Sequence, residues 1–303
     1  MSFSNSINDR NAGWLWAPDG RLRLGWRILL GFSALAVALL VAGVVGDASE
    51  SWFDRTIWLN REVVQAVVVA GLTIPLIILL RLRADRRSLA DIGFSKPLQA
   101  AGYFLFGAGM LAGVMGIPLL IMSAMGWLEV SIDISHEVLM LVTISIVVAF
   151  LFEALPEEVV VRGYLYRNLS AAMARWLASL VTLALFLLLP VVIAMTQQIV
   201  SGEEQQLLSL GYFGLLIPFG IVLQYLRVVT GNVWTCIGFH LAFLQMARHM
   251  GPREDAVIQL LEFQEGAPVD AVLQGVIILA FVFLLLYPWI FRRPVCWRER
   301  DPE

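Results

Sequence analysis

Eight long apolar stretches leave this 303-residue chain few ways to fold. They cover residues 27–46, 63–80, 101–127, 138–161, 176–195, 207–226, 232–247 and 271–291. A helix needs about 20 mostly apolar residues to cross the hydrocarbon core of a bilayer. The sequence therefore predicts an all-α, polytopic membrane helical bundle of about eight transmembrane helices. We expect residues 1–303 to form a single integral membrane domain, located in the inner or plasma membrane if the source is a bacterium.

The composition excludes several other classes of protein. Hydrophobic residues make up 59% of the chain and charged residues only 15%, whereas soluble domains are about 45–50% apolar and about 25% charged. The 21 basic residues do not outnumber the 24 acidic ones, so the chain has no excess of positive charge to hold a nucleic acid. Membrane lipid is therefore an expected partner, and nucleic acid is not.

The basic residues predict how the bundle is oriented. With the N-terminus in the cytoplasm, the eight stretches leave only four of the 21 basic residues outside, namely Arg55, Arg61, Arg248 and Arg253. Cytoplasmic loops of membrane proteins carry an excess of Lys and Arg, so both termini are predicted to be cytoplasmic. The stretch at 232–247 is short and is expected to begin or end inside a protein-lined cavity. The acidic and aromatic mixture within 248–270 is expected to form a surface helix.

Ionisable residues inside an apolar stretch mark candidate functional sites, because burying an unpaired charge in hydrocarbon costs several kcal/mol. The densest cluster contains Glu153, Glu157, Glu158 and Arg162. Glu158 and Arg162 are four residues apart in the acid-first order that favours an ion pair on a helix. Pro156 is expected to kink the helix and to direct Glu157 into the bundle. Alternatively, the span ends near 152, the acids face cytoplasmic water, and Arg162 lies at the membrane interface.

His240 is the second candidate, since its neighbours in the sequence are apolar. One interpretation is a hydrogen-bonded contact between helices, and the other is a donor or proton carrier in a cavity. His136 and His249 are expected to be ordinary loop or interface residues. Asn232, which follows Gly231, is expected to form a turn and to cap the next helix.

Three stretches of the chain resemble the CPBP family, also called Abi, which contains intramembrane proteases related to type II CAAX prenyl endopeptidases. The stretch PEEVVVRGYLYRNL is similar to the first family motif, Glu-Glu-x-x-x-Arg, and places Glu157, Glu158 and Arg162 in it. The stretch LQYLRVVTGNVWTCIGFH resembles the approach to the third motif and ends in His240. LRLGWRILL resembles a common family opening. The resemblance covers about residues 138–247.

The resemblance implies an endopeptidase that acts near the cytoplasmic membrane face on a peptide or a prenylated peptide. By this resemblance, Glu157 would activate the attacking water as general base. Glu158 and Arg162 would hold the site through their ion pair, and His240 would donate a hydrogen bond to the developing oxyanion.

The chain departs from two of the family motifs. The second motif is Phe-x-x-x-His, and here Phe186 is followed by Pro190 where the His should stand. The third motif is His-x-x-x-Asn, and here Leu244 replaces the Asn. Pro190 has no titratable group and Leu244 has no donor. Since only two carboxylates and one His would remain for a metal, we expect no bound metal, and no cofactor is implied.

The sequence leaves three functions open. The chain could be a working endopeptidase in which Gln197 or Gln245 compensates for the missing motif residues. It could be a catalytically inactive pseudoprotease that serves as a membrane binding or scaffold subunit for a peptide, a lipid or a membrane-protein partner. A third reading is a proton-coupled transporter that uses Glu153, Glu157 and His240 as a relay.

Overall fold

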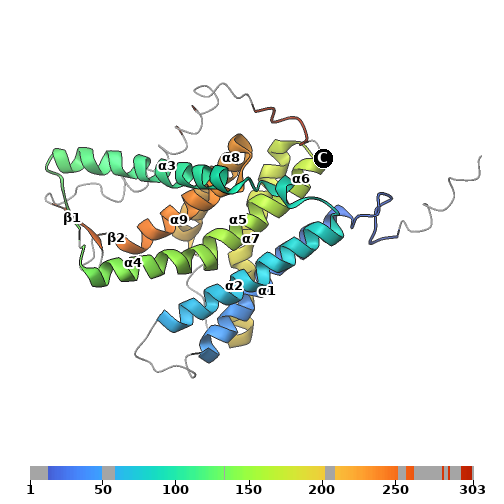
Figure 1. Cartoon of the computed structure of the whole chain (residues 1–303), viewed down its shortest axis with the longest axis horizontal. Helices are drawn as coiled ribbons and strands as arrows, with labels where there is room; N and C mark the ends of the chain where they lie inside the picture. Colours follow the sequence, from blue (N-terminus) through green and yellow to red (C-terminus); the bar gives the residue numbers. More distant parts are fainter. Residues whose placement is uncertain are drawn as a thin grey trace, which may run out of the picture.

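The computed structural model describes residues 13–49, 59–132, 134–201, 209–251, 257–262, 282, 286 and 295–301. Long α-helices dominate this part of the chain (Figure 1). They are α1 (Leu24–Ser49), α2 (Leu59–Leu79), α3 (Pro97–Ala124), α4 (His136–Ala149), α7 (Arg175–Ser201), α8 (Leu210–Thr230) and α9 (Val233–His249). Between α4 and α7 the helical path continues through η4 (Phe150–Ala154), α5 (Leu155–Glu158), η5 (Val159–Leu165) and α6 (Tyr166–Ala172). After α2 come the short segments η2 (Leu80–Ala84) and η3 (Leu89–Ile92).

Six helical stretches in the described residues are long and apolar enough to cross a membrane. This confirms the prediction of an all-α membrane bundle. The path from α4 to α6 forms one such stretch, His136–Ala172, and ends about ten residues beyond the expected boundary at 161. With 17 residues, α9 is shorter, and its first turns are buried inside the protein. The expected span at 271–291 lies, except for residues 282 and 286, outside the described residues, so the count of eight spans remains a prediction.

The expected surface helix after α9 was wrong where the structure describes that region. Residues Ile258–Glu262 form strand β3, which pairs antiparallel with β1 (Leu128–Ile132) and parallel with β2 (Met250–Gly251). The segment GWLEVSI before α4 supplies the β-branched and apolar residues of β1. The strand forms because its backbone pairs with β1, a partner that is distant in the sequence and that local pattern does not reveal.

The turn between α8 and α9 forms as the sequence predicts. Gly231 has a φ of +67°, and its N–H donates to the carbonyl of Arg227. The Oδ1 atom of Asn232 then accepts the N–H of Trp234 at 2.9 Å and caps α9. This tight connection keeps α8 and α9 antiparallel and adjacent.

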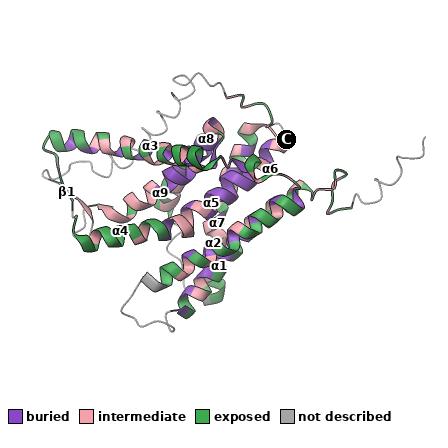
Figure 2. Ribbon diagram, viewed as in Figure 1, coloured by how far each residue is buried: buried purple, intermediate pink, exposed green. Residues whose placement is uncertain are grey.

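Two glycines let α3 and α9 approach closely. A Cβ atom on Gly107 would lie 2.0 Å from the carbonyl oxygen of Thr235, and one on Gly238 would lie 2.0 Å from that of Phe104. No side chain fits at either position without separating the helices. Figure 2 shows the buried residues concentrated where α9 meets α5 and α6, while the outer sides of α3 and α4 are mostly exposed. The glycine contact therefore fixes the helix that carries His240.

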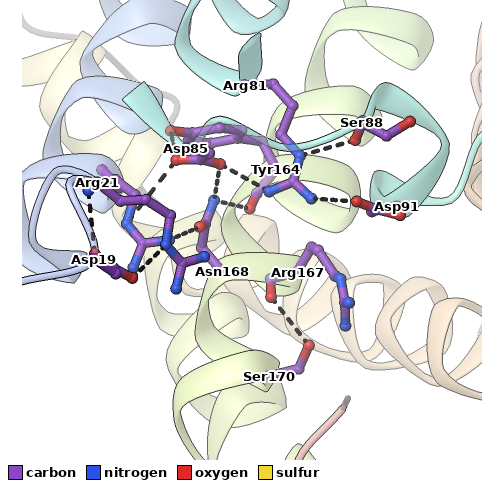
Figure 3. Close-up of polar contacts among 11 residues, drawn as sticks. Asp19, Arg21, Arg81, Asp85, Ser88, Asp91, Tyr164, Arg167, Asn168 and Ser170 are labelled. Carbon is purple, nitrogen blue, oxygen red and sulfur yellow. Dashed lines mark hydrogen bonds and ion pairs between the residues drawn. The ribbon is translucent and has the colours of Figure 1, made fainter. Parts of the chain in front are cut away.

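A buried polar cluster joins four segments at one end of the bundle (Figure 3). Its centre is the carboxylate of Asp85, which follows η2 and is fully buried. Asp85 accepts hydrogen bonds from Arg81 at 2.9 Å and from Tyr164 and Asn168 at 3.1 Å each. Arg27 of α1 donates to Asn168 at 2.6 Å and lies 3.9 Å from Asp85. We call Arg27, Arg81, Asp85, Tyr164 and Asn168 the Asp85 cluster.

The Asp85 cluster corrects part of the charge assignment. Arg27, Arg81, Arg162 and Arg227 were counted as cytoplasmic loop residues, but all four are buried inside the protein. Each has acceptors nearby that compensate for its removal from water. Arg81 and Arg162 pair with carboxylates, whereas Arg227 donates to two backbone carbonyls. These four arginines therefore contribute to packing inside the bundle, and they are not loop residues, as the charge count assumed.

Segments near both ends of the chain contact α6 (Figure 1). Arg27, at the start of α1, reaches Asn168. At the other end, the N–H of Asp301 donates to the carbonyl of Ser170 at 2.9 Å, and the carboxylate of Asp301 binds Arg175 at 2.5 Å. The start of α1 and the segment 295–301 thus lie at the same end of the bundle, as the predicted orientation requires. Their cytoplasmic location remains a prediction.

We expect Asp85→Asn to destabilise the folded protein by about 3–5 kcal/mol, because it removes the charge that compensates buried Arg81 and Arg27. Asp91→Asn is the matched control. Asp91 also binds Arg81, at 3.3 Å, but 40% of its side chain is exposed, so the loss should stay below about 1 kcal/mol. Thermal unfolding in detergent measures both variants. Equal losses would contradict the central role of Asp85.

Candidate active site

Three of the predicted site residues meet at one carboxylate. The Oε1 atom of Glu158 lies 3.1 Å from Nη1 of Arg162 and 2.9 Å from Nδ1 of His240. All three side chains are buried, with Glu158 fully enclosed. The predicted ion pair between Glu158 and Arg162 is therefore confirmed. The alternative in which the span ends near 152 and Arg162 lies at the membrane interface is wrong, because the helical path continues to Ala172 and η5 is buried throughout.

The local backbone explains how these side chains are directed. Pro156 cannot donate a backbone hydrogen bond, and its ring would clash with the carbonyl four residues earlier. The chain accommodates it with two wider π-helical turns, η4 before it and η5 after it. Such turns leave carbonyl groups without their usual helical partner. Arg227 of α8 satisfies one of them by donating through Nε to the carbonyl of Arg162 at 2.8 Å.

Glu157 lies on the wall of a cavity of about 480 Å³ that His240 also lines. This volume falls within the range of about 300–1,000 Å³ that is typical of ligand sites. The wall is mainly apolar, with residues from α1, α2, the α4–α6 path, α7, α8 and α9. In the described part of the chain, the Glu157 carboxylate has no hydrogen-bond partner. It is therefore available to bind a molecule in the cavity.

Aromatic rings hold the charged groups in place. The guanidinium of Arg162 lies 4.1 Å from the centre of the Phe186 ring, close enough for a cation–π interaction. The Phe219 ring meets the His240 imidazole edge to face, with centroids 5.0 Å apart. Because Nδ1 of His240 is engaged by Glu158, its Nε2 atom is the ring nitrogen left for chemistry.

The comparison with protein families agrees with these motifs. Residues 139–244 match the family model described as type II CAAX prenyl endopeptidase Rce1-like. The match agrees with the resemblance of this segment to the CPBP family. The segment contains every motif position discussed above. Searches of curated proteins and of solved structures gave no match. The six apolar helices and the family match together make the chain an integral, multi-pass membrane protein.

The two positions that depart from the CPBP motifs both lie on the cavity wall. Pro190 of α7 and Leu244 of α9 line the same cavity as Glu157 and His240. The structure is therefore consistent with aligning Pro190 and Leu244 to the motif His and Asn, because side chains at both positions line the cavity. Of the two suggested substitutes, Gln197 lines this cavity, whereas Gln245 donates to the carbonyl of Ser145 and lines a different one.

The remaining acid of the cluster has a different partner. Glu153 forms an ion pair with Arg248 of α9, a residue that was placed in an outside loop. His249 of α9 contacts the hydroxyl of Ser145 at 2.9 Å. A proton relay through Glu153 would have to break its ion pair, which weakens the transporter interpretation.

In the part of the chain that the structure describes, no three His, Cys, Asp or Glu side chains are grouped closely enough to hold a metal.

Sequence analysis missed two contributions to the site. Arg227 was treated as a loop charge, although it supports the backbone of the first motif. Asp85 was not singled out, although Tyr164 and Asn168 of the same motif stretch hold it. The stretch Arg-Gly-Tyr-Leu-Tyr-Arg-Asn gave no signal for this contact, because the partner lies 79 to 83 residues away.

We expect Glu158→Gln to destabilise the protein by about 3–5 kcal/mol, since it leaves the Arg162 charge buried without its carboxylate. Glu153→Gln is the control, because about a third of the Arg248 side chain is exposed. That loss should be about 1 kcal/mol or less. Thermal unfolding in detergent distinguishes the two. A Glu158→Gln protein as stable as the control would show that the carboxylate does not hold η5 and α9 together.

Proposed function

We propose that the chain is an intramembrane endopeptidase that hydrolyses peptide bonds with a water activated by Glu157. The observation that carries this proposal is the shared cavity of Glu157 and His240. One side offers a carboxylate with no described hydrogen-bond partner, and the other offers an imidazole fixed by Glu158. A general base and a hydrogen-bond donor on the same cavity wall are the minimum for hydrolysis of an amide.

In the proposed reaction, Glu157 removes a proton from water, and the hydroxide attacks the carbonyl carbon of the scissile bond. His240 acts as an imidazolium, with Nδ1–H donating to Glu158 and Nε2–H donating to the oxyanion. Glu157 then passes its proton to the leaving amine. Arg162 holds Glu158 in place through their ion pair, and is thus a positioning residue.

The absence of the second-motif His and the third-motif Asn makes the proposed enzyme slow. Loss of one oxyanion donor costs about 10²–10³ in rate, and such losses do not simply add. Gln197 does not stand in for a His at Pro190, because seven residues of α-helix separate them by about 10 Å. Turnover would therefore depend on Glu157 and His240.

A pseudoprotease is the second candidate, and a specific observation favours it. Both changed positions, Pro190 and Leu244, lie in the cavity wall, so the site has lost two polar groups where substrate would sit. The trio of Glu158, Arg162 and His240 would then be retained for the stability of the fold, and the cavity would bind a partner without cutting it.

Glu157→Gln should abolish cleavage, because a neutral amide cannot accept the proton from water. Purified protein in proteoliposomes is incubated with apolar membrane peptides and with prenylated peptides, and products are identified by mass spectrometry. Glu137→Gln is the control, because Glu137 lies in the exposed first turn of α4, far along the helical path from the site. Cleavage that persists in Glu157→Gln would rule out the proposed mechanism.

The same assay separates the two candidates through Pro190→His together with Leu244→Asn. For an enzyme, the unaltered chain cleaves and the double variant is faster by about tenfold or more. For a pseudoprotease, the unaltered chain cleaves none of the peptides, and cleavage appears only in the double variant.

A further inference from the structure

The cavity occupies only one half of the bundle. On α7, which begins at Arg175, the lining residues run from Phe186 to Gln197. On α8 they run from Tyr212 to Phe219, near its beginning. On α1 they are Leu39 and Gly43, in its second half. All these positions lie toward the end of the bundle where α1 and α7 finish and α8 starts.

Packed protein separates the opposite end of the bundle from this cavity, and we call that end the closed end. A different cavity, of about 370 Å³, lies there between residues 94–95, α3 and the start of α9. There η5 is buried along its whole length, and the Asp85 cluster ties it to α1 and η2. Arg227 fills the space beside Gly93, where its guanidinium lies 2.9 Å from the position that a Cβ atom would take. The segment 295–301 adds a further contact through Asp301 and Arg175. Among the described residues, none from this end lines the cavity of Glu157 and His240.

The closed end is also the basic end. It carries the arginines of the Asp85 cluster, Arg167 and Arg175, and the basic segment after α2. The excess of Lys and Arg assigns this end to the cytoplasm. The cavity then extends from the level of Glu157 and His240 toward the non-cytoplasmic side, whereas the sequence alone suggested a site near the cytoplasmic face.

The far part of the cavity has a distinct chemistry. Its neutral polar residues there are Gln65, Gln197 and Tyr212, among Leu, Ile and Phe side chains. Glu153 also lines the cavity, and its charge is paired with Arg248. Gly46 of α1 makes room for the Gln65 amide, and Gly43 lies beside the Gln197 amide. A Cβ atom on Gly46 would lie 2.6 Å from the Gln65 side chain, and one on Gly43 would lie 4.0 Å from that of Gln197. Neutral donors and acceptors on apolar walls match an extended apolar peptide, whose main chain offers N–H and C=O groups.

We propose that the site receives its substrate from the non-cytoplasmic side, as an apolar peptide segment whose main chain is bound by Gln65, Gln197 and Tyr212. The identity of the bound segment as a substrate rests on the proposed function. The direction of access does not, since it follows from the placement of the cavity. A charged carboxyl terminus presented from the cytoplasm would meet the closed end instead.

Thiol labelling tests the direction of access. The chain has two cysteines: Cys236 is buried and Cys296 is exposed at the closed end. In right-side-out membrane vesicles, a membrane-impermeant maleimide should leave Cys296 unlabelled until the membrane is permeabilised. In a Cys296→Ser background, Gln197→Cys should be labelled in intact vesicles, because a thiol must meet water to ionise and react.

Met195→Cys is the matched control, because Met195 lies two residues away on α7 and is 55% exposed on the outer surface of the helix. A thiol in contact with lipid should react at least about tenfold more slowly than one in the cavity. Ala194→Cys provides a second cavity position with a minimal change in size. The Cys296→Ser chain alone gives the background from buried Cys236.

Each outcome decides the proposal. Labelling of Gln197→Cys and Ala194→Cys from outside, with Cys296 protected, supports it. Labelling of the cavity positions only after permeabilisation, as expected for Cys296 in the unaltered chain, or no faster than Met195→Cys, overturns it. Cleavage plays no part in this readout, so a chain that labels as expected but never cleaves would overturn the proposed function and leave the direction of access intact.

Discussion

The structure depends on a single buried carboxylate that serves two partners. A charge inside a membrane protein is tolerated only when it is paired, and Glu158 pairs with Arg162 on its own helical path and with His240 on α9. The first contact stabilises η5, and the second joins η5 to a helix 82 residues away. Neither η5 nor α9 can shift without leaving a charge unpaired in the bundle.

A second buried carboxylate, Asp85, stabilises the same path at its other end. Tyr164 and Asn168 bind Asp85 about two turns after Glu158 binds His240. The π-helical segment η5 thus lies between two ionic contacts, with Arg227 satisfying the carbonyl of Arg162. This arrangement keeps one end of the bundle packed, and it leaves the space next to Glu157 as the cavity. The cost of buried charge therefore determines both the fold of this region and the position of the site.

The sequence predicted what depends on local spacing. The pairing of Glu158 with Arg162 follows from their separation by four residues, and the cap at Asn232 follows from the residue types of the turn. Contacts between distant segments could not be predicted in this way. The bond between Glu158 and His240, the partners of Asp85 and the pairing of β3 with β1 all join residues far apart in the chain.

The charge count illustrates the same limit. Arg27, Arg81 and Arg227 fall at the ends of apolar stretches, where a count assigns them to loops, but buried acceptors from other helices hold them inside. These buried arginines still lie at the end of the bundle where the other basic residues gather. The excess of basic residues at that end therefore remains after the correction. The family motifs indicated which residues to consider as site residues, and only the structure gave the direction in which their cavity extends.

The most direct test of the account is an experimental density map of the protein in a lipid bilayer, at a resolution that reveals ordered water. We predict a water molecule within hydrogen-bond distance of both the Glu157 carboxylate and Nε2 of His240, since a hydrolytic site needs its nucleophile between base and donor. Acyl-chain density against Glu157, or side chains packed between Glu157 and His240 with no water, would contradict the central claim that these two residues share a hydrolytic cavity.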